Sequence, residues 1–137
     1  MKIGDIEIGK SKVFVVAEAG INHNGNIEIA KQLIDIAKDS GADCVKFQKR
    51  VVEDVFTCAV LDRDYSSSKN SFGETYRLHK ENCELNEDQF RQLKEYADSR
   101  NILFTASPWD KKSADLLERI GVPFYKMASA DLNNLPL

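Results

Sequence analysis

Four stretches of the sequence end in polar residues that could do chemistry together, and each begins as an apolar run. The stretches are Val13–Asn24, Asp43–Arg50, Leu103–Asp110 and Pro123–Asp131. Apolar runs of this length predict strands that are buried in a parallel sheet. Because the carboxyl ends of parallel strands meet on one side of an α/β domain, we expect the polar residues that follow them to line one site.

The polar residues at these strand ends are suited to binding an anion. They are Glu18, Lys46, Gln48, Ser107, Lys126, Ser129 and Asp131. In the second strand, Val45 and Phe47 alternate with Lys46 and Gln48, so the apolar pair would meet helices and the polar pair would face the interior. A lysine buried within a strand is costly unless an anion offsets its charge. We therefore expect Lys46, together with Lys126, to bind an anionic ligand.

The elements that must position these residues alternate between strands and helices. A short hairpin is expected at Met1–Ile8, and strands are expected at Val13–Ala17, Asp43–Gln48, Ile102–Ser107 and Pro123–Ala128. Apolar residues at helical spacing predict the helices between them, and Asn26, Asn86 and Asp110 are placed as N-caps. The stretch Arg50–Leu85 lacks steady periodicity, which is typical of a lid or a substrate-contacting insertion.

This order of elements predicts the first half of a (β/α)8 TIM barrel, with four parallel strands, crossover helices and a preceding hairpin. A whole barrel takes about 250 residues, and this chain has 137. We expect residues 1–137 to form one partial barrel domain. Such a half would expose two strand edges. The chain is therefore expected to be a fragment, to assemble with another copy, or to close its sheet differently.

Composition excludes several classes of protein. Hydrophobic residues make up 42% of the chain and charged residues 30%, as in ordinary globular proteins. A net charge of −3 without a dense run of lysine and arginine argues against nucleic-acid binding. The N-terminal residues fit neither a signal peptide nor a membrane-spanning helix, and three cysteines without CxxC spacing argue against a disulfide framework. Cytoplasm is the expected compartment.

The motifs in these stretches resemble the sialic acid (N-acetylneuraminate) synthase family, transferases that condense phosphoenolpyruvate with an N-acylated amino sugar. The matching motifs run in family order and are AEAGINHNG (17–25), GADCVKFQ (41–48), NSFGETY (70–76), LFTASPWD (103–110) and GVPFYKMASADLNNLPL (121–137). The resemblance implies the N-terminal half of the family's catalytic barrel. It also implies that the second half-barrel and a small antifreeze-like C-terminal domain are absent from this chain.

The resemblance implies a reaction in which C3 of phosphoenolpyruvate attacks the aldehyde of N-acetylmannosamine, giving N-acetylneuraminate and phosphate. It implies a divalent metal, usually manganese, as the Lewis acid, and a homodimer in the full-length family. The family's two histidine ligands lie on later strands, and His23 and His79 do not match them, so no metal is assigned to this chain. A synthase of legionaminic or pseudaminic acid is the alternative enzyme. A non-catalytic, self-associating half-barrel is the alternative from another class.

Carried over by position, the resemblance assigns a role to each polar residue. The family holds phosphoenolpyruvate with two lysines and two hydroxyls, which match Lys46, Ser107, Lys126 and Ser129. Two ammonium groups offset a trianion, and hydroxyls orient it. Glu18 and Gln48 match catalytic positions beside the reacting atoms, with Glu18 as a proton shuttle or a partner of the aldehyde. Asn70 and Asp131 match sugar contacts, and the family often has glutamate where Asp131 stands.

Each assignment has a plain structural alternative. The two lysines would pair with Glu18 and Asp131 or reach solvent, and the two serines would end strands and bond the neighbouring backbone. His23 would be a turn residue, and His79 a surface or lid residue. Without the metal ligands and half of the barrel rim, the chain by itself is expected to be inactive.

Overall fold

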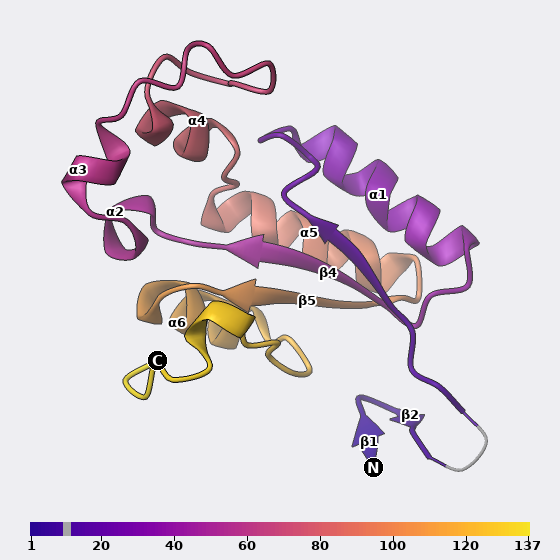
Figure 1. Ribbon diagram of the computed structural model, residues 1–137. Helices are drawn as coiled ribbons and strands as arrows, with labels where there is room; N and C mark the ends of the chain where they lie inside the picture. The colour runs from indigo at the N-terminus through magenta and orange to yellow at the C-terminus, as the bar shows by residue number, and fades with distance from the viewer. Residues whose placement is uncertain (10–11) are drawn as a thin grey trace.

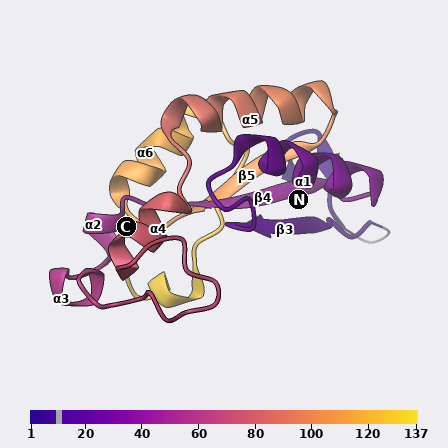
Figure 2. The same ribbon diagram turned by 90° about the horizontal axis from the view of Figure 1, so that it is seen from above.

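A parallel sheet of three strands runs through the computed structural model, which describes residues 1–9 and 12–137. In sheet order the strands are β3 (Val16–Gly20), β4 (Cys44–Lys49) and β5 (Leu103–Pro108). Three longer helices cover one face of this sheet, as Figures 1 and 2 show. They are α1 (Ile27–Asp39), α5 (Glu87–Ser99) and α6 (Lys111–Ile120).

Shorter elements surround this layered unit. The expected hairpin is confirmed as β1 (Lys2–Ile3) paired antiparallel with β2 (Ile6–Glu7). The expected insertion after β4 carries three short helices, which are α2 (Val52–Val55), α3 (Cys58–Leu61) and α4 (Tyr76–Asn82). A single 3-10 turn, η1 (Ser129–Asp131), lies near the C-terminus. Within the described residues, no helix has the length and apolar character needed to cross a membrane.

The three long helices begin where their capping residues predict. The Asn26 side chain accepts hydrogen bonds from two backbone N–H groups of the first turn of α1. Asn86 and Gln89 form a reciprocal capping box at the start of α5, and Asp110 accepts from the backbone of Ser113 at the start of α6. Each cap satisfies N–H groups that have no partner inside the helix. Local sequence therefore fixes where these helices start.

The hydrophobic core lies between the helices and the sheet. Val45 and Phe47 are fully buried on the face of β4 that meets the helices, as their alternation with polar residues predicts. The Phe47 ring stacks on that of Phe104 from β5 at 5.5 Å between centroids, and Phe90 from α5 packs edge-on against Phe104 at 6.1 Å. Because this face is filled, the alternating polar residues of β4 must lie on the opposite face.

The first strand differs from its expected position and burial. It covers Val16–Gly20 rather than Val13–Ala17, and Val13 and Val15 are 79% and 49% exposed. The expectation that this apolar run is buried on both faces is therefore wrong. The physical reason is that β3 lies at the border of the sheet and, among residues 1–9 and 12–137, pairs with β4 alone.

The fourth expected strand, Pro123–Ala128, is also wrong, because this segment joins no ladder in the described part of the chain. It is tied to β5 by one side chain, since Thr105 Oγ1 donates to the carbonyl oxygen of Phe124 at 2.5 Å. The Phe124 ring also meets that of Phe14 edge-on at 6.0 Å. Pro123 lacks a backbone donor, and a strand here would pair on one side only, so little favours a regular ladder.

The turn between β3 and α1 is held against the end of α4 by a close approach of backbone to backbone. Gly25 has a φ of +74°, and a Cβ atom placed on it would lie 2.1 Å from the carbonyl oxygen of Asn82. Only glycine fits such an approach without movement of the neighbouring chain. The site loop after β3 and the insertion after β4 therefore share a contact.

This contact predicts that Gly25→Ala destabilises the chain more than Gly41→Ala. Both glycines have positive φ, +74° and +80°, but nothing lies within 4 Å of a Cβ placed on Gly41. Alanine at Gly41 is expected to cost about 1 kcal/mol for its backbone conformation alone. Alanine at Gly25 must also displace the Asn82 carbonyl, for a total of about 3 kcal/mol. Urea unfolding measures both losses, and equal values would contradict the contact.

Candidate active site

Polar side chains form two rows across the face of the sheet that the helices leave free. The parallel register aligns Glu18 of β3 with Lys46 of β4 and Thr105 of β5. Two residues further toward the carboxyl ends of the strands, Gln48 of β4 aligns with Ser107 of β5. The structure thus brings together Glu18, Lys46, Gln48 and Ser107, four of the eight residues that sequence analysis assigned to the site.

Lys46 lies at the centre of these rows, and its burial is confirmed. The residue is 7% exposed. Its Nζ makes an ion pair with the Glu18 carboxylate and lies 3.5 Å from the hydroxyl of Ser107, itself buried. The Glu18 side chain is 53% exposed, so solvent reaches the carboxylate but hardly reaches the ammonium. An anion approaching from solvent would therefore meet a desolvated positive charge whose present partner lies at the surface.

Glu18 and Gln48 converge above Gly20, at the end of β3. The strand register shifts between Glu18 and Gly20, and Gly20 has a φ of +58°. A Cβ atom on Gly20 would lie 3.3 Å from Oε1 of Glu18 and 3.5 Å from Nε2 of Gln48. The missing side chain leaves room for both polar groups over the backbone. A carboxylate and an amide with free N–H groups therefore border the same small space.

The other four assigned residues are not brought to Lys46. Lys126, Ser129 and Asn70 are exposed, and no hydrogen bond or ion pair joins them to Lys46 in the part of the chain that the structure describes. Asp131 is half-buried and accepts a hydrogen bond from Asn134 at 3.0 Å rather than pairing with Lys126. The expectation that Lys126 is buried on a strand, as Lys46 is, is wrong. Its segment is not a strand, and the Lys126 side chain is exposed. Their ligand contacts stay predictions.

A buried ionic cluster, which sequence analysis missed, lies directly behind Gln48. Lys49 and Arg50, at 8% and 5% exposed, both contact the carboxylate of Glu84, with N–O distances of 2.9 Å each. Burial raises the pKa of Glu84, while the two cations act in the opposite direction. Arg50 also lies 5.0 Å from the ring centre of Trp109. A sequence signal for the cluster was the run of two basic residues directly after a buried strand.

The two histidines are buried by different neighbours. His23 is 1% exposed in the turn after β3, and its Nδ1 accepts from the backbone N–H of Gly25 at 3.1 Å. Burial, aided by the charge of Lys49, lowers the pKa of His23 to about 4. His79 of α4 lies among the rings of Tyr65, Phe72 and Tyr76, at 4.6, 5.9 and 6.1 Å. His79 thus belongs to the insertion but is not a surface residue.

The divalent metal that the resemblance implies does not fit the residues of this chain. Among residues 1–9 and 12–137, no three histidine, cysteine or acidic side chains gather within reach of one ion. Nδ1 of His23 already accepts a hydrogen bond. No chemical step is therefore assigned to a metal held by these residues.

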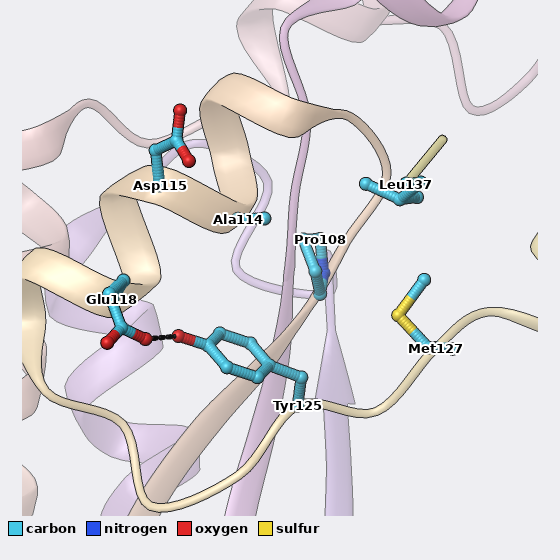
Figure 3. Close-up of a pocket in the computed structure, with 7 residues that line it drawn as sticks. All are labelled: Pro108, Ala114, Asp115, Glu118, Tyr125, Met127 and Leu137. Carbon is cyan, nitrogen blue, oxygen red and sulfur yellow. Dashed lines mark hydrogen bonds between the residues drawn. The ribbon is translucent and has the colours of Figure 1, made fainter. Parts of the chain in front are cut away.

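A separate pocket of about 290 Å³ lies between α6 and the C-terminal segment (Figure 3). The carboxyl groups of Asp115 and Glu118 border it, and the Tyr125 hydroxyl donates to Glu118. The described residues that line it include no basic side chain. Two carboxylates repel an anion, so this pocket does not compete with Lys46 as an anion site.

The fold and the polar rows define an α/β protein of the barrel type whose candidate site runs from the middle of the strands to their carboxyl ends. Comparison with known proteins identifies the family: residues 33–137 match the NeuB family, and the chain belongs to it. The resemblance to sialic acid synthases is thereby confirmed.

Individual relatives carry related names. Human N-acetylneuraminate-9-phosphate synthase is 44% identical over 128 residues, covering 93% of this chain and 35% of the relative. N,N'-diacetyllegionaminic acid synthase of Campylobacter jejuni is 36% identical over 125 residues, covering 91% of this chain and 37% of the relative. The chain thus spans about a third of the length of the curated relatives it matches.

A solved structure confirms the predicted fold class. The N-acetylneuraminic acid synthetase of Leptospira borgpetersenii serovar Hardjo-bovis, in complex with citrate, superposes with a TM-score of 0.79 at 35% identity. The match covers 99% of this chain and 43% of that structure. The chain is therefore part of a (β/α) barrel, with three parallel strands where sequence analysis expected four.

The lowered pKa of His23 predicts a dependence of stability on pH. Between its usual pKa of 6.5 and about 4, the unfolded chain binds a proton at this histidine and the folded chain does not. Stability should therefore fall as the pH falls through this window. Urea midpoints measured from pH 7 to pH 4 should decline less steeply in His23→Gln than in the unsubstituted chain. Parallel declines would show that His23 does not remain neutral in the folded protein.

Proposed function

We propose that this chain supplies the phosphoenolpyruvate-binding side of a synthase that joins phosphoenolpyruvate to an N-acetylated amino sugar. The observation that carries the proposal is the buried ammonium group of Lys46, which lies beside the Ser107 hydroxyl at the carboxyl end of the sheet. Membership of the NeuB family and the synthase names of the relatives support it. The proposed enzyme acts in sialic acid biosynthesis in the cytoplasm.

In the proposed reaction, a bond forms between C3 of phosphoenolpyruvate and the aldehyde carbon of the open-chain sugar. Water supplies the new oxygen at C2, and phosphate leaves. Lys46 neutralises part of the ligand's negative charge, and the Ser107 hydroxyl orients it. Binding draws Lys46 from Glu18 toward the ligand, and the freed carboxylate then holds or moves a proton on the oxygen of the former aldehyde.

N-acetylmannosamine is the proposed sugar, either free or with a 6-phosphate. The three carbons of phosphoenolpyruvate precede C1 of the hexose in the product, so C9 of the product is C6 of the sugar. The name of the human relative includes a 9-phosphate, which favours the 6-phosphate form. A sugar for legionaminic or pseudaminic acid is the alternative, since relatives with those names are 36% and 30% identical. Asn70 and Asp131 are the proposed sugar contacts.

Two further parts of the proposal lie outside the described residues. The family resemblance implies a divalent metal, usually manganese, which would act as a Lewis acid on the aldehyde. The ligands of this metal would come from residues that are not in this chain. The proposed whole enzyme is a homodimer.

Lys126 and Ser129 would complete the phosphoenolpyruvate site once their segment is packed against neighbouring strands.

The chain alone is expected to release no phosphate from phosphoenolpyruvate in the presence of manganese and either form of N-acetylmannosamine. A chimera in which residues 1–137 replace the matching part of the human relative should release phosphate only when both substrates are present. Lys46→Met should lower kcat/KM of the chimera by at least about 100-fold, since a buried charge at the ligand is lost. A phosphate-release assay measures all three.

The matched control is Lys111→Met, because Lys111 is an exposed lysine on α6 with a side chain 80% accessible. It should leave kcat/KM of the chimera unchanged. Phosphate release by the chain alone would overturn its expected inactivity. A folded chimera in which Lys46→Met and Lys111→Met behave alike would contradict the proposed site.

A non-catalytic half-barrel that pairs with a second copy is the second candidate. The observation that favours it is the exposure of Val13 and Val15 beside the unpaired edge of β3. If this edge is used, Val15→Lys should shift the chain from dimer to monomer in sedimentation velocity. A monomer at high concentration before substitution counts against this candidate.

A further inference from the structure

We infer that Arg50 is a positioning residue, whose guanidinium decides which end of the Gln48 amide faces the ligand. The inference deepens the proposed function and rests on it, since Gln48 matters only if an anion binds beside Lys46. Its basis is the geometry behind β4, where the buried ionic cluster of Lys49, Arg50 and Glu84 meets the site.

Arg50 contacts Gln48 directly. Its Nη2 donates to Oε1 of Gln48 at 2.6 Å. A guanidinium has five N–H donors and no acceptor, so the amide atom that faces it must be the oxygen. The two N–H groups of Gln48 are then forced to the other side, where Nε2 lies over Gly20 close to Glu18. The orientation follows from hydrogen-bond chemistry alone.

Arg50 is itself held in place by two residues, Glu84 and Trp109. Its Nε lies 2.9 Å from Oε1 of Glu84, and its backbone N–H donates to Oε2 of the same residue at 3.3 Å. The Trp109 ring lies on another side, at 5.0 Å from the guanidinium carbon. With only 5% of the residue exposed, the guanidinium has little freedom to move. Because the guanidinium of Arg50 is fixed, the Gln48 amide that it contacts is held in one orientation.

The consequence is a site in which Lys46, Gln48 and Ser107 all present N–H or O–H groups to a ligand. Lys46 and Gln48 lie two residues apart on the same face of β4, and Ser107 is the register partner of Gln48. The Ser107 oxygen accepts from the Lys46 ammonium, which leaves its O–H hydrogen available to donate, and the ammonium and the Gln48 amide N–H groups are donors as well. If the amide were reversed, its carbonyl oxygen would face the same ligand and repel it. Arg50 therefore sets the site's preference for oxygen-rich anions such as phosphoenolpyruvate.

The test compares four variants of the chimera in which residues 1–137 replace the matching part of the human relative. Arg50→Met removes the donor to Gln48, and Arg50→Lys restores one donor. Lys49→Met is the matched control, because Lys49 shares Glu84 but donates to the Arg50 carbonyl rather than to Gln48. Lys46→Met removes the proposed anion site itself. Calorimetric titration with phosphoenolpyruvate and ¹⁵N relaxation of the Gln48 side-chain amide are measured on each folded variant.

Arg50→Met should weaken phosphoenolpyruvate binding about tenfold, the value of one hydrogen bond to a charged group. It should also make the Gln48 amide mobile. Arg50→Lys should recover part of the affinity, while Lys49→Met should leave the affinity and the rigid amide unchanged. If Arg50→Met fails to fold, Glu84→Gln releases the anchor of Arg50 with little change in shape and should loosen the Gln48 amide.

The outcomes separate the two proposals. If Lys46→Met loses binding while Arg50→Met binds like Lys49→Met, the positioning role of Arg50 is overturned and the proposed function stands. If Lys46→Met binds as tightly as the unsubstituted chimera, or the folded chimera binds no phosphoenolpyruvate, the proposed site is wrong and the inference fails with it. A rigid Gln48 amide in Arg50→Met would overturn the inference whatever the affinities.

Discussion

The burial of one ammonium group organises this structure. Lys46 stands in the central strand of the sheet, where a positive charge out of water is costly unless it is compensated. Val45 and Phe47 fill the opposite face of β4, so the lysine side chain must lie on the polar face of the sheet. The Glu18 carboxylate and the Ser107 hydroxyl supply the compensation. The space above Gly20, the strand register and the polar rows all serve to bring these groups to one point.

A second charged layer stabilises the first from behind. Glu84 joins Lys49 and Arg50, although it lies 34 residues after Arg50 in the sequence, at the far end of the insertion. A buried carboxylate of this kind contributes little net stability, since its desolvation cost offsets much of the attraction. The Glu84 carboxylate instead fixes geometry, because it holds Arg50, and Arg50 orients the Gln48 amide. The insertion is thereby tied to the site as well as to the loop after β3.

Sequence reasoning succeeded where the determining contacts are local. The alternation of Val45 and Phe47 with Lys46 and Gln48 predicts the two faces of β4, and Asn86 with Gln89 predicts the start of α5, because both patterns repeat within a few residues. It failed where burial depends on distant neighbours. Val13 and Lys126 have suitable local patterns, but no other strand covers them in the described chain. Arg50 was missed because its role depends on Glu84 and Trp109, which only the fold brings near.

The ion pair between Lys46 and Glu18 gives the resting site its own counter-ion. Half-exposed Glu18 balances the charge of Lys46, so the buried ammonium has a counter-ion when no ligand is bound. In the proposed synthase, phosphoenolpyruvate would replace the Glu18 carboxylate as the partner of Lys46. The same exchange would free the Glu18 carboxylate only when the ligand is bound.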